Sequence, residues 1–244
     1  MTFSADAHDW GLPARVVFQP LVDLHEWKVV GFEALARFER LSSPLEAFAR
    51  AERDGRREEL ELKLIELAID AAPQLPEDLF ITLNASGTTM LEPRLADMLD
   101  AMVRPWGLEL FEAATPVDLT VVRARVTALG GQLLVDDAGA ANADVPRIMQ
   151  LRPDVVKIDR ALFWKVTSDA AARAELEELL EAARDIGARV LVEGIAEAEH
   201  VDLARSLGAD LGQGFHIGMP TPAEEVPAML RSLHRGIGVD APGL

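Results

Sequence analysis

Short apolar segments recur along this chain, and six of them end in an ionisable or amide side chain. In an α/β barrel, parallel strands bring their carboxyl ends to one rim, and helices carry the chain back between the strands. Polar residues at successive strand ends then meet above a single cavity. The six strand ends are marked by Glu33, Asn84, Glu109, Asp136, Lys157 and Glu193.

The spacing of the apolar segments predicts the topology. The first two, at 14–22 and 28–38, are separated by only five residues. That linker is too short for a crossover helix, so these segments are expected to form an antiparallel hairpin. Further strands are expected at 79–84, 107–111, 132–136, 154–158, 188–192 and 210–216, and helices at 44–54, 57–74, 88–103, 116–129, 144–150, 169–186, 196–207 and 222–235. The fold class is therefore α/β, a modified (β/α)8 barrel of the TIM type with an antiparallel first strand.

Length and charge restrict the organisation and the partners. A chain of 244 residues with 49% hydrophobic residues suits one barrel domain, which we predict over 13–235 with tails at 1–12 and 236–244. The net charge of -17 argues against a nucleic acid polymer or an anionic membrane as the main partner. The chain has no apolar run that could span a bilayer and no signal-peptide pattern at its start, which predicts a cytoplasmic location.

The carboxylates among the six strand ends predict a metal-dependent site. Glu33, Glu109, Asp136 and Glu193 would repel one another on a shared rim unless positive charge lay between them, and divalent cations are the usual source of it. The chain has no cysteine, and none of its five histidines is spaced as a ligand with another. Oxygen ligands are therefore expected, which suit a hard ion such as Mg2+.

Longer motifs follow one another in a fixed order. They are Gln19-Pro20, Glu33-Ala34-Leu35-Ala36-Arg37, Asn84, Glu109-Leu110-Phe111-Glu112, Asp136-Asp137, Lys157-Ile158-Asp159, Glu193-Gly194-Ile195 and Gln213-Gly214-Phe215. As a set they closely resemble the EAL domain family, which comprises bacterial cyclic di-GMP phosphodiesterases and their inactive relatives. The resemblance implies hydrolysis of one 3',5'-phosphodiester bond of cyclic di-GMP, which gives linear pGpG.

The resemblance also implies roles for individual residues. The first Mg2+ or Mn2+ ion would be held by Glu33, Asn84, Glu109 and Asp136, and the second by Asp137, while Glu193 would help to hold metal and is a candidate general base. Lys157 would lie beside the attacked phosphate and Gln213 near the nucleophilic water. Arg37 would contact phosphate, Gln19 and Leu35 would line the nucleotide pocket, and Glu112 would steady the loop after the fifth strand. The residue types fit this chemistry, because two ions can neutralise a phosphodiester and activate water.

Three departures from the family concern the residues around these groups. Active members usually read Asp-Asp-Phe-Gly-Thr-Gly where this chain reads Asp136-Asp137-Ala138-Gly139-Ala140-Ala141, Phe111 replaces a small hydroxyl residue, and Ala196 replaces a glutamate. Contacts of this supporting kind are commonly worth about ten- to a hundredfold in metal affinity or activity. The departures predict a weakly held second ion and slow or conditional hydrolysis.

Two functions of different classes remain open at this point. The retained ligand types favour a phosphodiesterase, whereas the altered loop favours a non-catalytic domain that binds cyclic di-GMP or, as an interaction module, a protein partner or a second copy of itself. Each polar residue taken alone also has a structural explanation, since single carboxylates at strand ends often cap turns or helices. Their joint occurrence at one end of successive strands is what the structural explanation does not predict.

Overall fold

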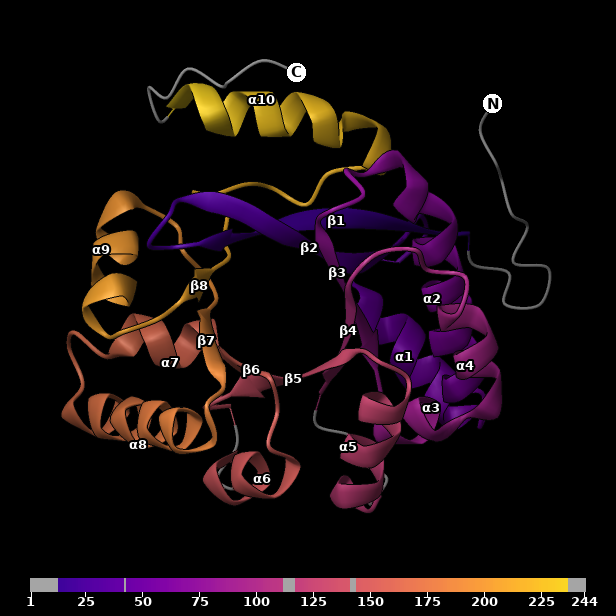
Figure 1. The fold of residues 1–244 in the computed structure, drawn as a ribbon, viewed down its shortest axis with the longest axis horizontal. Coiled ribbons are helices and arrows are strands. Elements are labelled where there is room, and N and C mark those ends of the chain that lie inside the picture. The colour runs from indigo at the N-terminus through magenta and orange to yellow at the C-terminus, as the bar shows by residue number, and fades with distance from the viewer. Residues whose placement is uncertain (1–12, 42, 112–116, 141–143, 237–244) are drawn as a thin grey trace.

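In the computed structural model, which describes residues 13–41, 43–111, 117–140 and 144–236, eight strands close into a barrel (Figure 1). The strand β1 is antiparallel to both of its neighbours, β2 and β8, and all other neighbouring strands are parallel. The predicted barrel with an inverted first strand is therefore confirmed. The strands are β1 (Ala14–Asp23), β2 (Lys28–Phe38), β3 (Phe80–Ala85), β4 (Trp106–Leu110), β5 (Gln132–Ala138), β6 (Val155–Ile158), β7 (Arg189–Val192) and β8 (Leu211–Gly212).

Helices surround this ring of strands (Figure 1). They are α1 (Pro44–Arg53), α2 (Arg57–Ala71), α3 (Gly87–Leu91), α4 (Pro93–Leu99), α5 (Leu119–Ala128), α6 (Asp144–Leu151), α7 (Arg160–Lys165), α8 (Ala170–Ile186), α9 (Ala198–Ser206) and α10 (Val226–Gly236), with 3-10 turns at Ala72–Gln74 and Ala223–Glu225. None of the helices in the described ranges has the combined length and apolar character that crossing a membrane requires.

Three local differences from the expected elements have physical causes. The helix expected at 88–103 is broken into α3 and α4, because Glu92 is extended and Pro93 cannot donate the hydrogen bond that would continue a helix. The helix α7 was not predicted, and it begins where the Asp159 carboxylate accepts a hydrogen bond from Ala161 N at 2.8 Å. The strand expected at 210–216 ends at Gly212, because the chain turns there, with Ile217 N donating to Gly214 O.

The predicted tails fall almost entirely outside the described residues, so the domain limits stay a prediction. Of the two tails, 1–12 and 236–244, only Gly236 is described, and it ends α10.

The interior of the barrel has an apolar floor directly beneath the polar strand ends. The floor consists of Leu21, Leu134, Val155, Leu191 and Leu211, which form one buried cluster. Side chains two residues apart on a strand point to the same face. The same alternation that sends these five side chains inward therefore directs the polar residues two positions away, Gln19, Asp136, Lys157, Glu193 and Gln213, into the barrel above them.

Candidate metal centre and substrate pocket

The polar strand ends meet above this floor, at the carboxyl ends of the parallel strands. The predicted site residues come from β1 (Gln19), β2 (Glu33, Leu35 and Arg37), β3 (Asn84), β4 (Glu109), β5 (Asp136 and Asp137), β6 (Lys157) and the positions just after β7 and β8 (Glu193 and Gln213). Glu112 lies outside the described residues, and its predicted supporting role stays a prediction.

Lys157 occupies the centre of the group and is 1% exposed. Its Nζ lies 2.5 Å from Glu109 Oε2, 2.7 Å from Asp136 Oδ1, 2.9 Å from Glu193 Oε1 and 3.6 Å from Glu33 Oε2. Burial alone would lower the pKa of Lys157, but the surrounding carboxylates outweigh this effect and raise the pKa well above its usual value. The lysine is therefore a buried cation that links four strands through their carboxylates.

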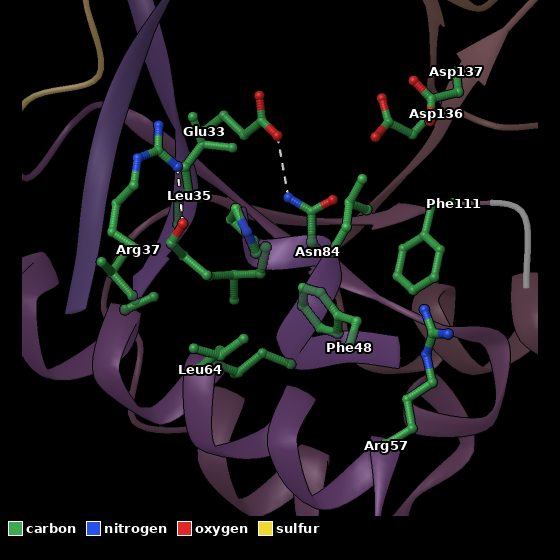
Figure 2. A pocket seen from close by; sticks show the side chains of 18 of the residues that line it. Glu33, Leu35, Arg37, Phe48, Arg57, Leu64, Asn84, Phe111, Asp136 and Asp137 are labelled. Carbon is green, nitrogen blue, oxygen red and sulfur yellow. Dashed lines mark hydrogen bonds between the residues drawn. The ribbon is translucent and has the colours of Figure 1, made fainter. Parts of the chain in front are cut away.

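Amide side chains connect a second set of residues across the barrel. Gln213 Nε2 donates to Glu33 Oε2 at 2.6 Å and to Gln19 Oε1 at 3.2 Å. Asn84 Nδ2 donates to the other oxygen of Glu33 at 3.1 Å, as Figure 2 shows. Both oxygens of this buried carboxylate thus have a partner, which fixes the orientation of Glu33.

Three other carboxylates, those of Glu109, Asp137 and Glu193, have raised pKa values because the positive charge nearby does not offset their burial and mutual repulsion. Burial and the neighbouring charge of Glu33 raise the pKa of Glu109 well above its usual value. Burial raises the pKa of Asp137 to about 6, with a further contribution from Asp136. Burial also raises the pKa of Glu193 to about 7, although Lys157 acts in the opposite direction. Five carboxylates therefore compete for a single buried lysine.

The donor atoms fit a divalent cation. Buried Glu109 Oε1 and Asp136 Oδ1 accept no hydrogen bond in the described residues, and the 2.7 Å contact of Asp136 Oδ1 with Lys157 is an ion pair without hydrogen-bond geometry. Asp136, Asp137 and Glu193 each offer a carboxylate oxygen, and these oxygens lie within 4.8 Å of one another. Carboxylate oxygens brought together in this way suit a hard ion such as Mg2+ or Mn2+.

The backbone at the end of β5 sets the direction of Asp137. This residue has a φ of 54°, in the left-handed region, while the peptide N–H of Gly139 donates to the buried Asp144 carboxylate at 2.6 Å. Ala140 N donates to Asp137 O at 3.0 Å, and Asp159 N donates to Ala138 O at 2.9 Å. The described part of this departing segment, up to Ala140, is thus held by Asp144, a contact that could not be identified from the sequence.

A cavity of about 770 Å³ opens beside the carboxylates, and Figure 2 shows its lining. Its polar end carries Glu33, Asn84, Asp136 and Asp137, whereas Leu35, Phe48, Leu64 and Phe111 form apolar walls, and Arg37 lines the same cavity. A second cavity of about 310 Å³ contains Gln19, Gln213, Trp164 and Glu193. Glu33 and Leu35 line both cavities, so a ligand that spans the carboxylates can reach into either one.

Phe111, where the family has a small hydroxyl residue, packs against an arginine. Arg57 Cζ lies 4.8 Å from the centre of the Phe111 ring, and Figure 2 shows the guanidinium beside it. Arg57 Nε also donates to buried Glu61 at 2.8 Å, and Glu61 accepts hydrogen bonds from Ser86 N and Oγ. The wall formed by Phe111 is therefore fixed by a polar network that the sequence analysis missed.

Comparisons with known proteins agree with this geometry. The pattern of the EAL domain family matches residues 14–220. The chain is 27% identical over 236 residues to the cyclic di-GMP phosphodiesterase PA2567 of Pseudomonas aeruginosa, covering 89% of this chain and 40% of that protein. It is 26% identical over 228 residues to the probable cyclic di-GMP phosphodiesterase PdeB of Escherichia coli, covering 86% of this chain and 43% of that protein. The chain thus spans less than half the length of both relatives.

A solved structure shows the same fold. The manganese and cyclic di-GMP complex of BlrP1 from Klebsiella pneumoniae matches with a TM-score of 0.75 and 27% identity, over 86% of this chain and 57% of that one. Because the family pattern covers most of the barrel, from β1 to the segment after β8, this chain belongs to the EAL domain family.

Proposed function

We propose that the chain is a phosphodiesterase that hydrolyses one bond of cyclic di-GMP to give linear pGpG, with two divalent ions. The observation that carries the proposal is the cluster of four carboxylates around Lys157, with Asp137 beside them, which opens onto a cavity of about 770 Å³ lined by Arg37. The names of PA2567 and PdeB and the contents of the BlrP1 complex support this choice of substrate and of metal.

The residues of the site divide the work as follows. Glu33, Asn84, Glu109 and Asp136 would hold one ion, and Asp136, Asp137 and Glu193 the other. Divalent ions in such sites supply charge neutralisation for the phosphate and acidify the attacking water. Glu193 would take the proton from that water as the general base.

The positive and amide side chains would bind and orient the substrate. Lys157 would place a positive charge beside the attacked phosphate, and Gln213 would orient the water. Arg37 presents a planar guanidinium that suits a second phosphate oxygen pair. Gln19 and Leu35 would line the part of the pocket that receives the nucleoside. With these contacts, the bound substrate would extend from one cavity, past the carboxylates, into the other.

A direct test incubates the chain with cyclic di-GMP, with and without Mn2+, and separates the products by chromatography. We expect pGpG to form only when Mn2+ is present. The Arg37→Ala variant should bind cyclic di-GMP more weakly, whereas Arg40→Ala, at an exposed position on the same part of the chain, serves as the matched control. Unchanged affinity in Arg37→Ala would place the nucleotide elsewhere.

A non-catalytic receptor is the second candidate, and one observation favours it. Lys157 makes ion pairs with four carboxylates, so part of the negative charge is balanced by the chain itself. Tight binding of cyclic di-GMP with no product at any Mn2+ concentration would support this function over hydrolysis. If the chain neither bound cyclic di-GMP nor formed product, both functions would be rejected.

A further inference from the structure

The turn after β7 carries Glu193 and lies directly against α7. Gly194 has a φ of +75°, a backbone conformation that residues other than glycine rarely adopt. A Cβ added to Gly194 would lie 2.4 Å from the Cβ of Arg160 and 3.3 Å from Trp164 Nε1. The backbone next to Glu193 is thus in close contact with two residues of α7.

Trp164 makes the polar contact in this region. Its indole Nε1 donates to Gly194 O at 2.8 Å. The residue remains 48% exposed, and it lines the 310 Å³ cavity together with Glu193 and Asp136. Burial of the ring in the core therefore does not account for its position, whereas the hydrogen bond to the turn does.

His200 of α9 holds the same turn from its other end. Its Nδ1 accepts a hydrogen bond from Ala196 N at 3.2 Å. The imidazole ring packs edge-on against buried Phe163, with ring centres 5.6 Å apart, and lies 6.2 Å from the Trp164 ring. Both ends of the 194–196 segment are thus attached to a connected set of rings from α7 and α9.

These contacts stand where the chain departs from its family. Position 196 is alanine instead of the usual glutamate, so the carboxylate that normally stands three residues after Glu193 is missing. Backbone atoms of Gly194 and Ala196 are held instead, by Trp164 and His200. The hydrogen bonds from Ile195 N to Gln213 O and from His216 N to Ile195 O attach the middle of the segment to the chain after β8.

We propose that Trp164 and His200 are positioning residues that hold the Glu193 carboxylate in the metal-binding cluster. The proposal rests on the proposed function for the role of Glu193, and it extends that function to two residues outside the family motifs. Trp164 fixes the carbonyl that follows Glu193, and His200 fixes the N–H two residues later. The positions of both side chains are coupled through their ring contact.

The variant Trp164→Phe tests the hydrogen bond, because phenylalanine keeps an aromatic ring but has no N–H donor. His200→Ala removes the hydrogen-bond acceptor. His200→Asn supplies another, because the asparagine Oδ1 lies at the same distance along the side chain as the histidine Nδ1. Trp27→Phe is the matched control. Trp27 lies at the β1–β2 turn, next to the start of β8 and so at the opposite rim, where it stacks on Arg205.

The first readout is the affinity for Mn2+ without substrate, measured by electron paramagnetic resonance of the free ion. Trp164→Phe and His200→Ala should each weaken the binding of Mn2+ at the Glu193 site by about tenfold, as expected for residues that orient a ligand. His200→Asn should recover most of the affinity, and Trp27→Phe should match the unmodified chain. Unchanged Mn2+ affinity in both folded variants, as checked by circular dichroism, would overturn the proposal.

The second readout is turnover of cyclic di-GMP. A positioning role lowers kcat by about tenfold and leaves KM unchanged. A rise in KM with an unchanged kcat would mean that the indole contacts substrate, and this would also overturn the proposal. If the unmodified chain shows no turnover, the proposed function fails, but the Mn2+ affinities still decide the role of Trp164 and His200.

Discussion

Glu33 and Glu109 are held by side chains that reach across the barrel, whereas Asp137 and Glu193 lie at or next to positive-φ positions of the backbone, and Glu193 also pairs with Lys157. In the inner half of the site, which comprises Glu33, Asn84 and Glu109, the two glutamates are 6% and 0% exposed. In the outer half, which comprises Asp137 and Glu193, positive φ angles occur at Asp137, near the end of β5, and at Gly194, just after β7. Asp136 belongs to both halves.

This difference shows which parts of a barrel site depend on the sheet and which depend on loops. Strand pairing and the apolar floor fix the inner half, so it tolerates changes in the loops. The outer half depends on contacts such as those of Asp144 with Gly139 N and of Trp164 with Gly194 O. Loss of the buried cation that joins the inner half should therefore destabilise the whole barrel, whereas changes to the carboxylates of the outer half should mainly affect metal affinity.

The largest effect is expected from Lys157→Met. It leaves four carboxylates facing one another without their buried cation, and the loss of one partner of a buried ion pair typically costs about 3–5 kcal/mol. Urea unfolding without metal should show this loss, and Mn2+ should restore more stability to the variant than to the unmodified chain. An unfolding free energy equal to that of the unmodified chain would mean that Lys157 does not hold the inner half together.

Glu109→Gln should separate stability from metal binding. The carboxylate is fully buried and its pKa is raised, so a neutral amide should leave the metal-free chain at least as stable. Loss of a direct ligand should weaken Mn2+ binding and turnover by more than about a hundredfold, the upper value for a supporting contact. Calorimetric titration with Mn2+ measures the affinity, and Glu178→Gln on the exposed surface of α8 is the control. Unchanged Mn2+ affinity would remove Glu109 from the site.

Asp137→Asn tests the outer half alone. We expect the Mn2+ concentration for half-maximal turnover to rise about tenfold, with the stability of the metal-free chain unchanged or slightly higher, because burial and Asp136 disfavour the ionised form of Asp137. Turnover measured against Mn2+ concentration checks this expectation. The exposed Asp185→Asn provides the matched control. A loss of barrel stability in Asp137→Asn would show that the two halves are not independent.

A smaller effect concerns pH. The folded-state pKa values of about 6 for Asp137 and about 7 for Glu193 lie above the ordinary values of these carboxyl groups, 3.8 and 4.5. The folded chain therefore binds more protons than the unfolded chain between about pH 4 and pH 7, and the contribution of these groups to stability falls as pH rises through that window. Mn2+ competes with the same protons, so it should raise the melting temperature more at about pH 8 than at about pH 6. Equal shifts at both pH values would contradict the assignment of the outer half.

Most of the inner half could be predicted from the sequence, because it follows from two periodic patterns. Alternation along the strands gives the inward direction, and the order of strand and helix gives the common rim. The closed barrel and the meeting of Glu33, Asn84 and Glu109 at one rim follow from these patterns without knowledge of any loop.

The rest could not be predicted, because it depends on which side chains from different elements touch. The sequence places Lys157 at a strand end but does not show that it contacts four carboxylates. Trp164 lies on α7, a six-residue helix too short to give a periodic signal. The break at Pro93, by contrast, could have been recognised from the proline itself.

The strand β8 is only two residues long, so its pairing with its neighbours is the shortest in the barrel. This strand has two register pairs with β1 and two with β7, whereas β1 and β2 share ten. Local opening is favoured where few backbone hydrogen bonds must break together. Thermal breathing of the sheet should therefore begin at β8. Because Gln213 directly follows β8, its hydrogen bond to Gln19 is the contact of the site that this motion should affect most.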